Sequence, residues 1–488
     1  MKQTGTYMST VHFVIAFLSL HVAIAAAFIH PIEVKGNHFV DAITNEPFFI
    51  KGVDYQPGGS SEVSEKQDPL SDPNTCARDI ILFQELGINT IRIYSINPAL
   101  NHDTCMTMLA SAGIYLILDV NSPLQNQHLN RYEPWTTYNP HYLEHVFKII
   151  EQFGYYNNTL GFFAGNEIIN DKKSAQHSPP YVKRLINDMK LYIKGHSPRT
   201  IPVGYSAADD LKYRVPLSKY LECLDPNYPE ASVDFYGVNS YQWCGGQTFE
   251  SSGYDALVEA YKNFTKPVFF SEFGCNEVLP RTFDEVSTIY SKDMHMVFSG
   301  GLVYEFTQGA NNYGLIEVDT EGNAHLLNDF DSLRTQYASV SLPTLQQISR
   351  NVISDPILNR RTSSLHIPVC NHEYENIEIT AKVPNTLASD FLRRGVRVTH
   401  GKYVNLADKD LMSSYKIYDK NGKPYKERTK VEVVQNINPL SDSNGQNVNK
   451  VQNLAASTFS NVNIPFLLTC VFSYLLLETG FQVAIASF

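Results

Sequence analysis

The sequence predicts an α/β protein organised as a (β/α)8 TIM barrel with a small β-rich appendage at its C-terminal side. Between residues 40 and 335, short β-type runs alternate with segments that show helical spacing of apolar residues. The β-type runs are nearly continuously apolar, as expected for parallel strands buried on both faces. Eight such units in about 300 residues match the size of this barrel. A doubly wound open sheet is the alternative, but no glycine-rich phosphate loop follows the first run.

The predicted barrel strands are spaced regularly along the chain. They are Phe49–Tyr55, Thr90–Ile96, Tyr115–Asn121, Leu160–Glu167, Thr200–Ser206, Val233–Tyr241, Pro267–Gly274 and Gly301–Thr307. Helical spacing is clearest between them in four segments, Cys76–Leu86, Tyr142–Phe153, Tyr181–Lys194 and Phe283–Phe298. This alternation of strand and helix is what the barrel requires.

The character of the chain changes after about Thr344. Short strands are predicted at Ile377–Val383, Val396–His400 and Tyr415–Tyr418. Asn421-Gly422 follows the last of these and is a hairpin-type turn signal. We therefore expect a small β-rich appendage that packs on the barrel as a buttress, although a role in ligand binding is the alternative.

The N-terminus has the pattern of a secretory signal peptide. Lys2 precedes an apolar stretch from Val11 to Ala27, and the alanines at its end suit cleavage just before Phe28. A membrane-anchoring helix is the alternative, but the stretch is short.

The C-terminus has the pattern of a glycolipid (GPI) anchor signal. A polar, Asn/Ser-rich stretch leads into an apolar tail, Ile464 to Phe488, which Glu478 interrupts. Ala455–Ser457 and Asn444-Gly445 are candidate attachment sites. A transmembrane tail and an ordinary apolar C-terminus are the alternatives.

These signals divide the chain into five regions. They are a signal peptide (1–27), a catalytic barrel (28–343), a β-rich appendage (344–435), a stalk with the anchor attachment zone (436–463) and an apolar tail that is removed (464–488).

The cysteines and sequons fit a secreted glycoprotein. The chain has seven cysteines, of which Cys470 lies in the removed tail. The other six could form three disulfides, and the sequence alone leaves the pairing open. Asn157-Asn-Thr and Asn263-Phe-Thr can accept N-glycans, and each is then expected on an exposed loop.

The net charge of −11 and the lack of a basic patch argue against nucleic acid as a partner. The sequence also lacks a CxxC motif or a His/Cys cluster that would indicate a metal site.

Two glutamates stand at the C-terminal ends of the fourth and seventh predicted strands. They are Glu167, in Gly161-Phe-Phe-Ala-Gly-Asn-Glu, and Glu272, in Pro267-Val-Phe-Phe-Ser-Glu-Phe-Gly. In a parallel barrel the C-terminal strand ends form the mouth where chemistry takes place. A retaining glycosidase needs two carboxyl groups there, one as proton donor and one as nucleophile. We therefore expect Glu167 to be the acid/base, Glu272 to be the nucleophile, and Asn166 to bond the sugar 2-hydroxyl.

Other polar residues at strand ends converge on the same mouth. Tyr241 could donate a hydrogen bond to the nucleophile and hold it ionised, and Arg92 could do the same electrostatically. Tyr94 and Tyr304 could stack on sugars. The remaining candidates are Asp54, Tyr55, Asp119, Asn121, Asn239 and Glu305.

Five motifs together resemble a known family. They are Lys51–Gly58 (KGVDYQPG), Gly87–Ser95 (GINTIRIYS), Gly165–Glu167 (GNE), Val233–Cys244 (VDFYGVNSYQWC) and Phe270–Cys275 (FSEFGC). In these the chain resembles the fungal β-1,3-glucanosyltransferases of glycoside hydrolase family 72, GPI-anchored enzymes that remodel the cell wall. The resemblance covers about residues 29–340.

The resemblance implies a double displacement. A β-1,3-glucan is cleaved internally, and the new end is held on Glu272 and passed to the 3-hydroxyl of another glucan's non-reducing end. The family's cleft positions are matched by Asn166, Tyr94, Asp119, Tyr241, Gln56 and Tyr304. The family's cysteine pattern implies Cys76–Cys105, Cys223–Cys370 and Cys244–Cys275.

The chain departs from many family members in lacking a C-terminal cysteine-rich carbohydrate-binding module, and so resembles the subfamily without it. Donor and acceptor β-1,3-glucan are the implied partners, and no cofactor or metal is implied. The implied location is the cell surface, with a GPI anchor in the outer leaflet of the plasma membrane and a place in the cell wall. An endo-β-1,3-glucanase and a non-catalytic glucan-binding protein are the alternatives.

Overall fold

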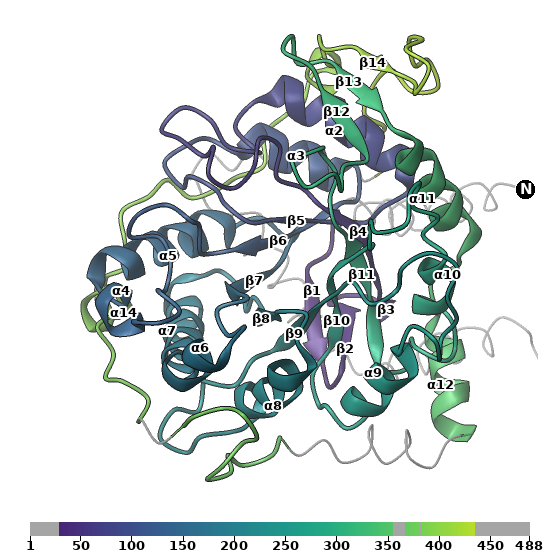
Figure 1. Ribbon diagram of the computed structural model, residues 1–488. Coiled ribbons are helices and arrows are strands. Elements are labelled where there is room, and N and C mark those ends of the chain that lie inside the picture. Colours follow the sequence, from purple (N-terminus) through teal and green to yellow (C-terminus); the bar gives the residue numbers. More distant parts are fainter. Residues whose placement is uncertain (1–28, 355–366, 380–381, 435–488) are drawn as a thin grey trace, which may run out of the picture. The chain divides into compact units, whose positions relative to one another are not determined.

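The computed structural model, which describes residues 29–354, 367–379 and 382–434, contains a closed parallel barrel (Figure 1). Its strands are hydrogen-bonded in the order β10-β11-β4-β5-β6-β7-β8-β9. Their bounds are β4 Ile50–Asp54, β5 Thr90–Ile93, β6 Tyr115–Asp119, β7 Thr159–Asn166, β8 Val203–Ala207, β9 Phe235–Ser240, β10 Val268–Phe273 and β11 Phe298–Val303. The predicted (β/α)8 barrel is therefore confirmed, and each predicted strand overlaps an observed one.

Helices lie outside the ring of strands (Figure 1). Those of the barrel are α2 Pro73–Leu86, α3 Asp103–Ser111, α4 Pro134–Thr137, α5 Pro140–Phe153, α6 Lys172–His177, α7 Pro179–His196, α8 Leu211–Glu222, α9 Tyr254–Tyr261, α10 Glu285–Ile289 and α11 Asn328–Ser339. Those of the C-terminal region are α12 Leu345–Ser354, α14 Ser389–Arg394 and the short 3-10 helix η1 Asp408–Leu411.

Local sequence signals fix the helix ends. At α2, the Asp72 side chain accepts the backbone N–H groups of Asn74 and Thr75, and Pro73 occupies the first helical position. Gly87 ends the helix in the left-handed conformation, with φ of 64°, which costs glycine little. The first cap begins the helix, and the second ends it just before strand β5 begins at Thr90.

An N-terminal hairpin closes the end of the barrel opposite the mouth. Strands β1 Ile32–Lys35, β2 His38–Asp41 and β3 Pro47–Phe48 form a small antiparallel sheet. Phe39 of β2 is fully buried, and its ring centroid lies 5.7 Å from that of Phe235 and 5.9 Å from that of Phe269. These two phenylalanines stand near the starts of β9 and β10. The sequence analysis did not predict this hairpin, because its strands are too short to show a clear period.

One predicted helix is largely wrong. The segment Phe283–Phe298 forms a helix only over Glu285–Ile289, and Phe298 already begins β11. The carbonyl of Ser291 accepts the N–H groups of Met294 and His295, and its hydroxyl accepts that of Asp293. The chain therefore turns at Ser291 instead of continuing the helix.

The region after Thr344 is less regular than predicted. Of its three predicted strands, only the last is confirmed, as β14 Ile417–Tyr418. It pairs in parallel with β13 Ala324–Leu326, which pairs antiparallel with β12 Ile316–Val318. Gly422 adopts φ of 76° in the predicted turn.

The strands predicted at Ile377–Val383 and Val396–His400 are absent from the described residues of those segments. Their backbone groups bond to the barrel's helical layer instead of to a neighbouring strand. The N–H of Glu378 donates to the carbonyl of Ala175, and the N–H of Val396 donates to the hydroxyl of Tyr192. A lone segment satisfied in this way has no partner with which to form a sheet.

Side chains also fasten the C-terminal segment to the barrel. His400 lies 2.8 Å from the Glu151 carboxylate and stacks on Tyr155, with ring centroids 4.2 Å apart. The hydroxyl of Tyr403 donates to Asn158. The described part of this segment belongs to the same compact unit as the barrel, and its role as a buttress stays a prediction.

The residues that the structure describes contain three disulfides. They join Cys76 to Cys105, Cys223 to Cys370, and Cys244 to Cys275, which are the pairs implied by the family resemblance. The second links the C-terminal segment to the residue that follows α8, and the third links the loops that follow β9 and β10.

The two sequons differ in exposure. Asn263 is exposed, and its glycosylation stays a prediction. Asn157 is only 2% exposed, and its amide donates to the carbonyl of Ile29. The expected exposed loop is therefore wrong for Asn157, because a glycan there would have to displace this packing.

The predicted signal peptide, stalk and tail lie outside the described residues. Within the described ranges, no helix combines the length and apolar character that a bilayer span requires.

Replacing both Cys223 and Cys370 with alanine should destabilise the protein by roughly 3–5 kcal/mol, because this bond closes a loop with a sequence separation of 147 residues. Urea unfolding followed by circular dichroism measures the loss. The matched control replaces Cys76 and Cys105, whose separation is only 29 residues, and should cost less. An equal or smaller loss for the Cys223–Cys370 pair would contradict this interpretation.

Candidate active site

The two predicted acids lie at the same end of the barrel, where β7 and β10 end. Glu272 belongs to β10, and Glu167 directly follows β7. Glu167 adopts a left-handed backbone conformation, with φ of 50°, and its N–H donates to the carbonyl of Ser206 on β8. Such a conformation is uncommon outside glycine and often marks a functional position.

Three donors hold the carboxylate of Glu272. Arg92 Nη1 lies 3.2 Å from Oε1, and the hydroxyl of Tyr94 donates to the same oxygen at 2.9 Å. The hydroxyl of Tyr241 donates to Oε2 at 2.7 Å. Each of these bonds stabilises the ionised form.

Arg92 is the fully buried cation at the centre of this group. Its Nε and Nη2 donate to the two oxygens of Asp119 at 3.0 and 2.9 Å, and Nη1 also donates to the carbonyl of Ser271. The planar guanidinium is therefore fixed in orientation by a two-point contact. The positive charge of Arg92 is therefore held in a fixed position next to Glu272.

Burial raises the pKa of Glu272 to about 7, and the negative charge of Glu167 adds to the rise. Arg92 and the hydroxyls of Tyr241 and Tyr94 lower that pKa. The side chain is only 7% exposed, so these three donors replace the water that would otherwise stabilise the charge.

Asn239 links Glu167 to Ser271, the residue before Glu272. Its Nδ2 donates to Glu167 Oε1 at 2.7 Å and to Asn166 Oδ1 at 3.2 Å. Its Oδ1 accepts from the hydroxyl of Ser271, which precedes the second acid, and from that of Ser206. The amide orientation is thus set by donors on one side and acceptors on the other.

Gln56 lies behind the site. Its Oε1 accepts the backbone N–H groups of Tyr94 and Ser95, each at 3.0 Å, and its side chain is nearly buried. Gln56 therefore fixes the direction in which Tyr94 leaves β5.

Tyrosines form one wall of the mouth. Tyr304 meets Tyr94 and Tyr241 edge to face, with ring centroids 6.4 and 6.3 Å apart, and Asn311 donates to its hydroxyl. Tyr313, which the sequence analysis did not single out, packs against Tyr241 at 5.5 Å. An isolated aromatic residue in a loop gives no sequence signal of its own.

Arg281 is a second residue that the sequence analysis missed. It is 2% exposed, pairs with Asp329 at 2.6 Å and donates to the carbonyls of Gly274 and Tyr304. It therefore holds Gly274, which follows β10, and Tyr304, which follows β11. Nothing in the local pattern distinguishes it from a surface arginine.

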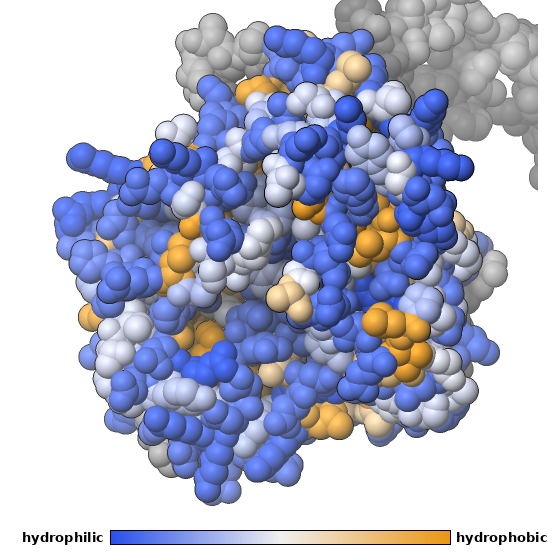
Figure 2. Space-filling view, turned by 45° about the horizontal axis from the view of Figure 1, so that its top comes forward, coloured by the Kyte–Doolittle hydropathy of each residue, from blue (hydrophilic) through white to orange (hydrophobic). Residues whose placement is uncertain are grey.

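A cavity of about 630 Å³ opens beside the acids. Its lining includes the predicted residues Tyr94, Asp119 and Asn166, together with Arg131 and Tyr132 of the loop after β6. The face of the molecule in Figure 2 is mostly hydrophilic, with apolar residues in separate patches. This lining of hydroxyl, amide and charged groups suits a polar ligand.

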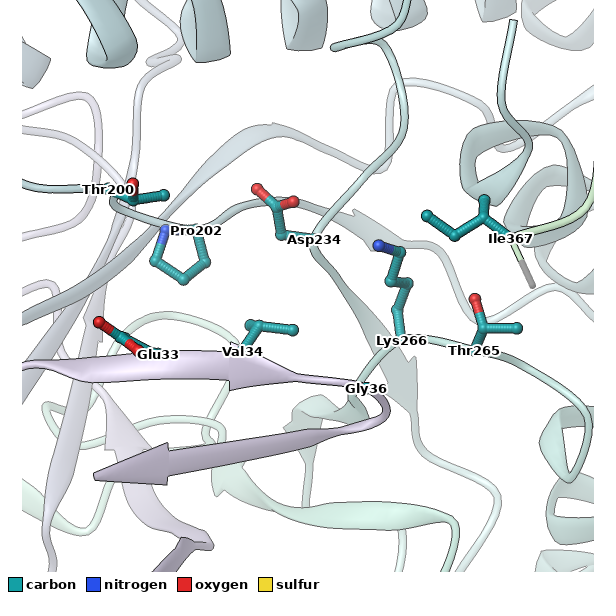
Figure 3. Close-up of a pocket in the computed structure, with 9 residues that line it drawn as sticks. All are labelled: Glu33, Val34, Gly36, Thr200, Pro202, Asp234, Thr265, Lys266 and Ile367. Atoms are coloured by element: carbon teal, nitrogen blue, oxygen red, sulfur yellow. The ribbon is translucent and has the colours of Figure 1, made fainter. Parts of the chain in front are cut away.

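A second cavity, of about 610 Å³, lies by the N-terminal hairpin (Figure 3). It is lined by Glu33 and Val34 of β1 and by residues just before β8, β9 and β10, among them Pro202, Asp234 and Lys266. These strand starts are at the end of the barrel away from both glutamates. Groups at that end of such barrels usually serve stability.

Among the described residues, the one grouping with metal-ligating spacing is Cys244, Cys275 and Glu277. The two cysteines are bonded to each other, so they offer no thiolate to a metal.

This geometry defines a class of protein. A (β/α)8 barrel with two carboxyl groups at its mouth, one of them bonded by an arginine and two tyrosines, is built for retaining glycoside chemistry. Comparison with known proteins is more specific. The glucanosyltransferase family, glycoside hydrolase family 72, matches residues 21–341. The chain belongs to this family.

Relatives match over most of their length. The chain is 59% identical to the 1,3-beta-glucanosyltransferase GAS4 of Saccharomyces cerevisiae over 434 residues, which are 89% of this chain and 90% of the relative. It is 44% identical to the 1,3-beta-glucanosyltransferase gel2 of Aspergillus fumigatus, over 82% of each chain. The solved structure of Saccharomyces cerevisiae Gas2p in complex with laminaripentaose aligns with a TM-score of 0.65, at 36% identity, over 73% of this chain and 77% of that one.

Replacing Tyr241 with phenylalanine should raise the pKa of Glu272 by about one pH unit, because a hydrogen bond to the carboxylate is lost. Carbon-13 NMR titration of glutamate-labelled protein measures the shift, and Glu272→Gln assigns the signal. The matched control is Tyr304→Phe, which removes a hydroxyl of the same wall that makes no bond to Glu272. An equal shift in both variants would contradict a direct role for the Tyr241 hydroxyl.

Proposed function

We propose that this protein is a retaining β-1,3-glucanosyltransferase that cleaves β-1,3-glucan internally and transfers the new end to another β-1,3-glucan. The observation that carries the proposal is the environment of Glu272, a buried carboxylate held by Arg92, Tyr94 and Tyr241 at the barrel mouth. Membership of the glucanosyltransferase family and the names of the relatives support the substrate and the transfer reaction.

In the first step, Glu167 protonates the glycosidic oxygen while a carboxylate oxygen of Glu272 bonds to the anomeric carbon. The reducing-end fragment leaves with that proton, and the rest of the chain stays as an ester on Glu272. Arg92, Tyr94 and Tyr241 support this step because they hold the nucleophile ionised and aimed until it reacts.

In the second step, the ionised Glu167 takes the proton of the acceptor's 3-hydroxyl. The acceptor oxygen then displaces Glu272 from the anomeric carbon, which restores both side chains. Asn239 is placed to support both steps, because it donates to Glu167 Oε1 and can stabilise the carboxylate between them.

The sugar contacts are assigned to the groups that surround the acids. Asn166 is the proposed partner of the 2-hydroxyl, Asp119 and Tyr94 line the cavity beside it, and Tyr304 and Tyr241 offer rings to the sugar faces. Gln56 has a supporting role through Tyr94. Binding energy for an acceptor sugar at these surfaces would favour transfer over attack by water.

The purified secreted protein should convert a reduced β-1,3-gluco-oligosaccharide of about a dozen sugars into both longer and shorter products, which mass spectrometry resolves. Glu272→Gln should lower the rate at least about a thousandfold, because the nucleophile is lost. Glu277→Gln, an exposed glutamate on the next loop, is the matched control and should act like the wild type. Shorter products alone would make the protein an endo-β-1,3-glucanase, and no products would favour a glucan-binding role.

We also propose that a GPI anchor holds the protein at the outer face of the plasma membrane. The apolar tail after a polar spacer supports this. Phosphatidylinositol-specific phospholipase C should release the protein from intact membranes, and deletion of residues 464–488 should send it to the culture medium. Protein that stays membrane-bound in both experiments would contradict the proposal.

A further inference from the structure

Asp54, the last residue of β4, is a buried carboxyl group that the proposed mechanism does not use. Its side chain is fully buried, and neither of its oxygens has a hydrogen-bond partner among the described residues. The closest cationic atom to it in an ion pair is Arg92 Nη1, at 4.0 Å from Oδ1. An ionised carboxylate that is buried without a hydrogen bond is costly, so its environment favours the neutral acid.

The donors around Asp54 are committed to other groups. Arg92 gives Nε and Nη2 to Asp119, and it gives Nη1 to Glu272 and to the carbonyl of Ser271. Tyr94 lies beside Asp54, but its single hydroxyl proton goes to Glu272. Asp54 is therefore the carboxyl in this group that makes no hydrogen bond among the described residues, and only the nearby charge of Arg92 and the Tyr94 hydroxyl lower its pKa.

The charges that face Asp54 give the same result. One cation, Arg92, stands among three buried carboxyl groups, those of Asp54, Asp119 and Glu272. The other titratable groups that face Asp54 are Tyr94, Tyr241, Tyr304 and Tyr337. Tyrosines contribute no positive charge, so a single arginine cannot neutralise all three acids.

We propose that Asp54 carries a proton in the free enzyme and so leaves the charge of Arg92 to Glu272 and Asp119. Asp54 is then a positioning residue, which acts on the nucleophile only through Arg92 and rests on the proposed role of Glu272. If Asp54 were ionised, it would compete for the guanidinium and repel Glu272, and the nucleophile would take up a proton more readily. Burial, which raises the pKa of Asp54 well above its usual value, agrees with this arrangement.

Infrared difference spectroscopy tests the proton directly. At pH 6 the spectrum of the full-length protein, minus that of Asp54→Asn, should contain the carbonyl stretch of one protonated carboxylic acid, which moves in D₂O. The acid bands of Glu272 and Glu285, whose pKa values burial raises to about 7, are common to both proteins and cancel. Because this readout needs no substrate, it holds even if the protein transfers no glucan. A difference spectrum without this band would overturn the proposal.

The acid limb of the kcat/KM profile tests the consequence for Glu272. Asp54→Asn replaces a neutral acid with a neutral amide, so the midpoint of this limb should stay where the wild type has it. Asp119→Asn is the matched control: it removes a carboxylate that competes for Arg92, so the pKa of Glu272 and the midpoint should fall, on the order of one pH unit. A comparable fall in Asp54→Asn would show that Asp54 is ionised and would overturn the proposal.

A fold defect in Asp54→Asn would be recognised by its thermal midpoint. In that case the wild type labelled with carbon-13 at the aspartate carboxyl serves instead. An isotope shift of the acid band assigns the proton to an aspartate. Titration of the band in unlabelled Glu272→Gln and Asp119→Asn variants then locates this aspartate. Loss of the Asp119 charge should lower the pH at which the band is lost. A band unaffected by the label would overturn the assignment.

Discussion

The arrangement of the barrel mouth depends on one buried guanidinium. Arg92 is fully enclosed and joins β5 to β6 through Asp119 and to β10 through Glu272 and the Ser271 carbonyl. A buried charge is tolerated only when its donors are satisfied, so Arg92 requires these groups to stay in place. The same contacts that offset the cost of burying the Arg92 charge also orient the carboxylate of Glu272.

The surrounding residues fix the groups that Arg92 does not reach. Gln56 directs Tyr94 through two backbone N–H groups, and Asn239 ties Glu167 to Ser271. Arg281 does the corresponding work for the chain after β11. Arg92 and Asn239, which contact the acids, are thus themselves held by further hydrogen bonds, which is the preorganisation that catalysis by charged groups needs.

Stability comes from parts of the chain far from the mouth. Phe39, Phe235 and Phe269 fill the opposite end of the barrel, and the Cys223–Cys370 disulfide and His400 fasten the C-terminal segment to the helical layer. This division separates an end that phenylalanine rings close from a polar end that carries both acids, whose like charges would be costly in a less constrained setting.

The sequence by itself determined the barrel, its eight strands and the two glutamates. A strand buried on both faces has to be apolar throughout, so it can be recognised in the sequence. A carboxylate at or directly after the C-terminal end of such a strand lies at the mouth of the barrel, independently of the loops and helices between the strands. The sequence did not determine the Phe39 hairpin, the turn at Ser291 or the irregular path of Ile377–Val383, because each depends on which barrel group is near enough to bond or pack. Nor could it find Arg281 or distinguish Asp54 from Asp119: both aspartates end a barrel strand, and only the tertiary structure decides that Arg92 points its donors at Asp119 and leaves Asp54 without one.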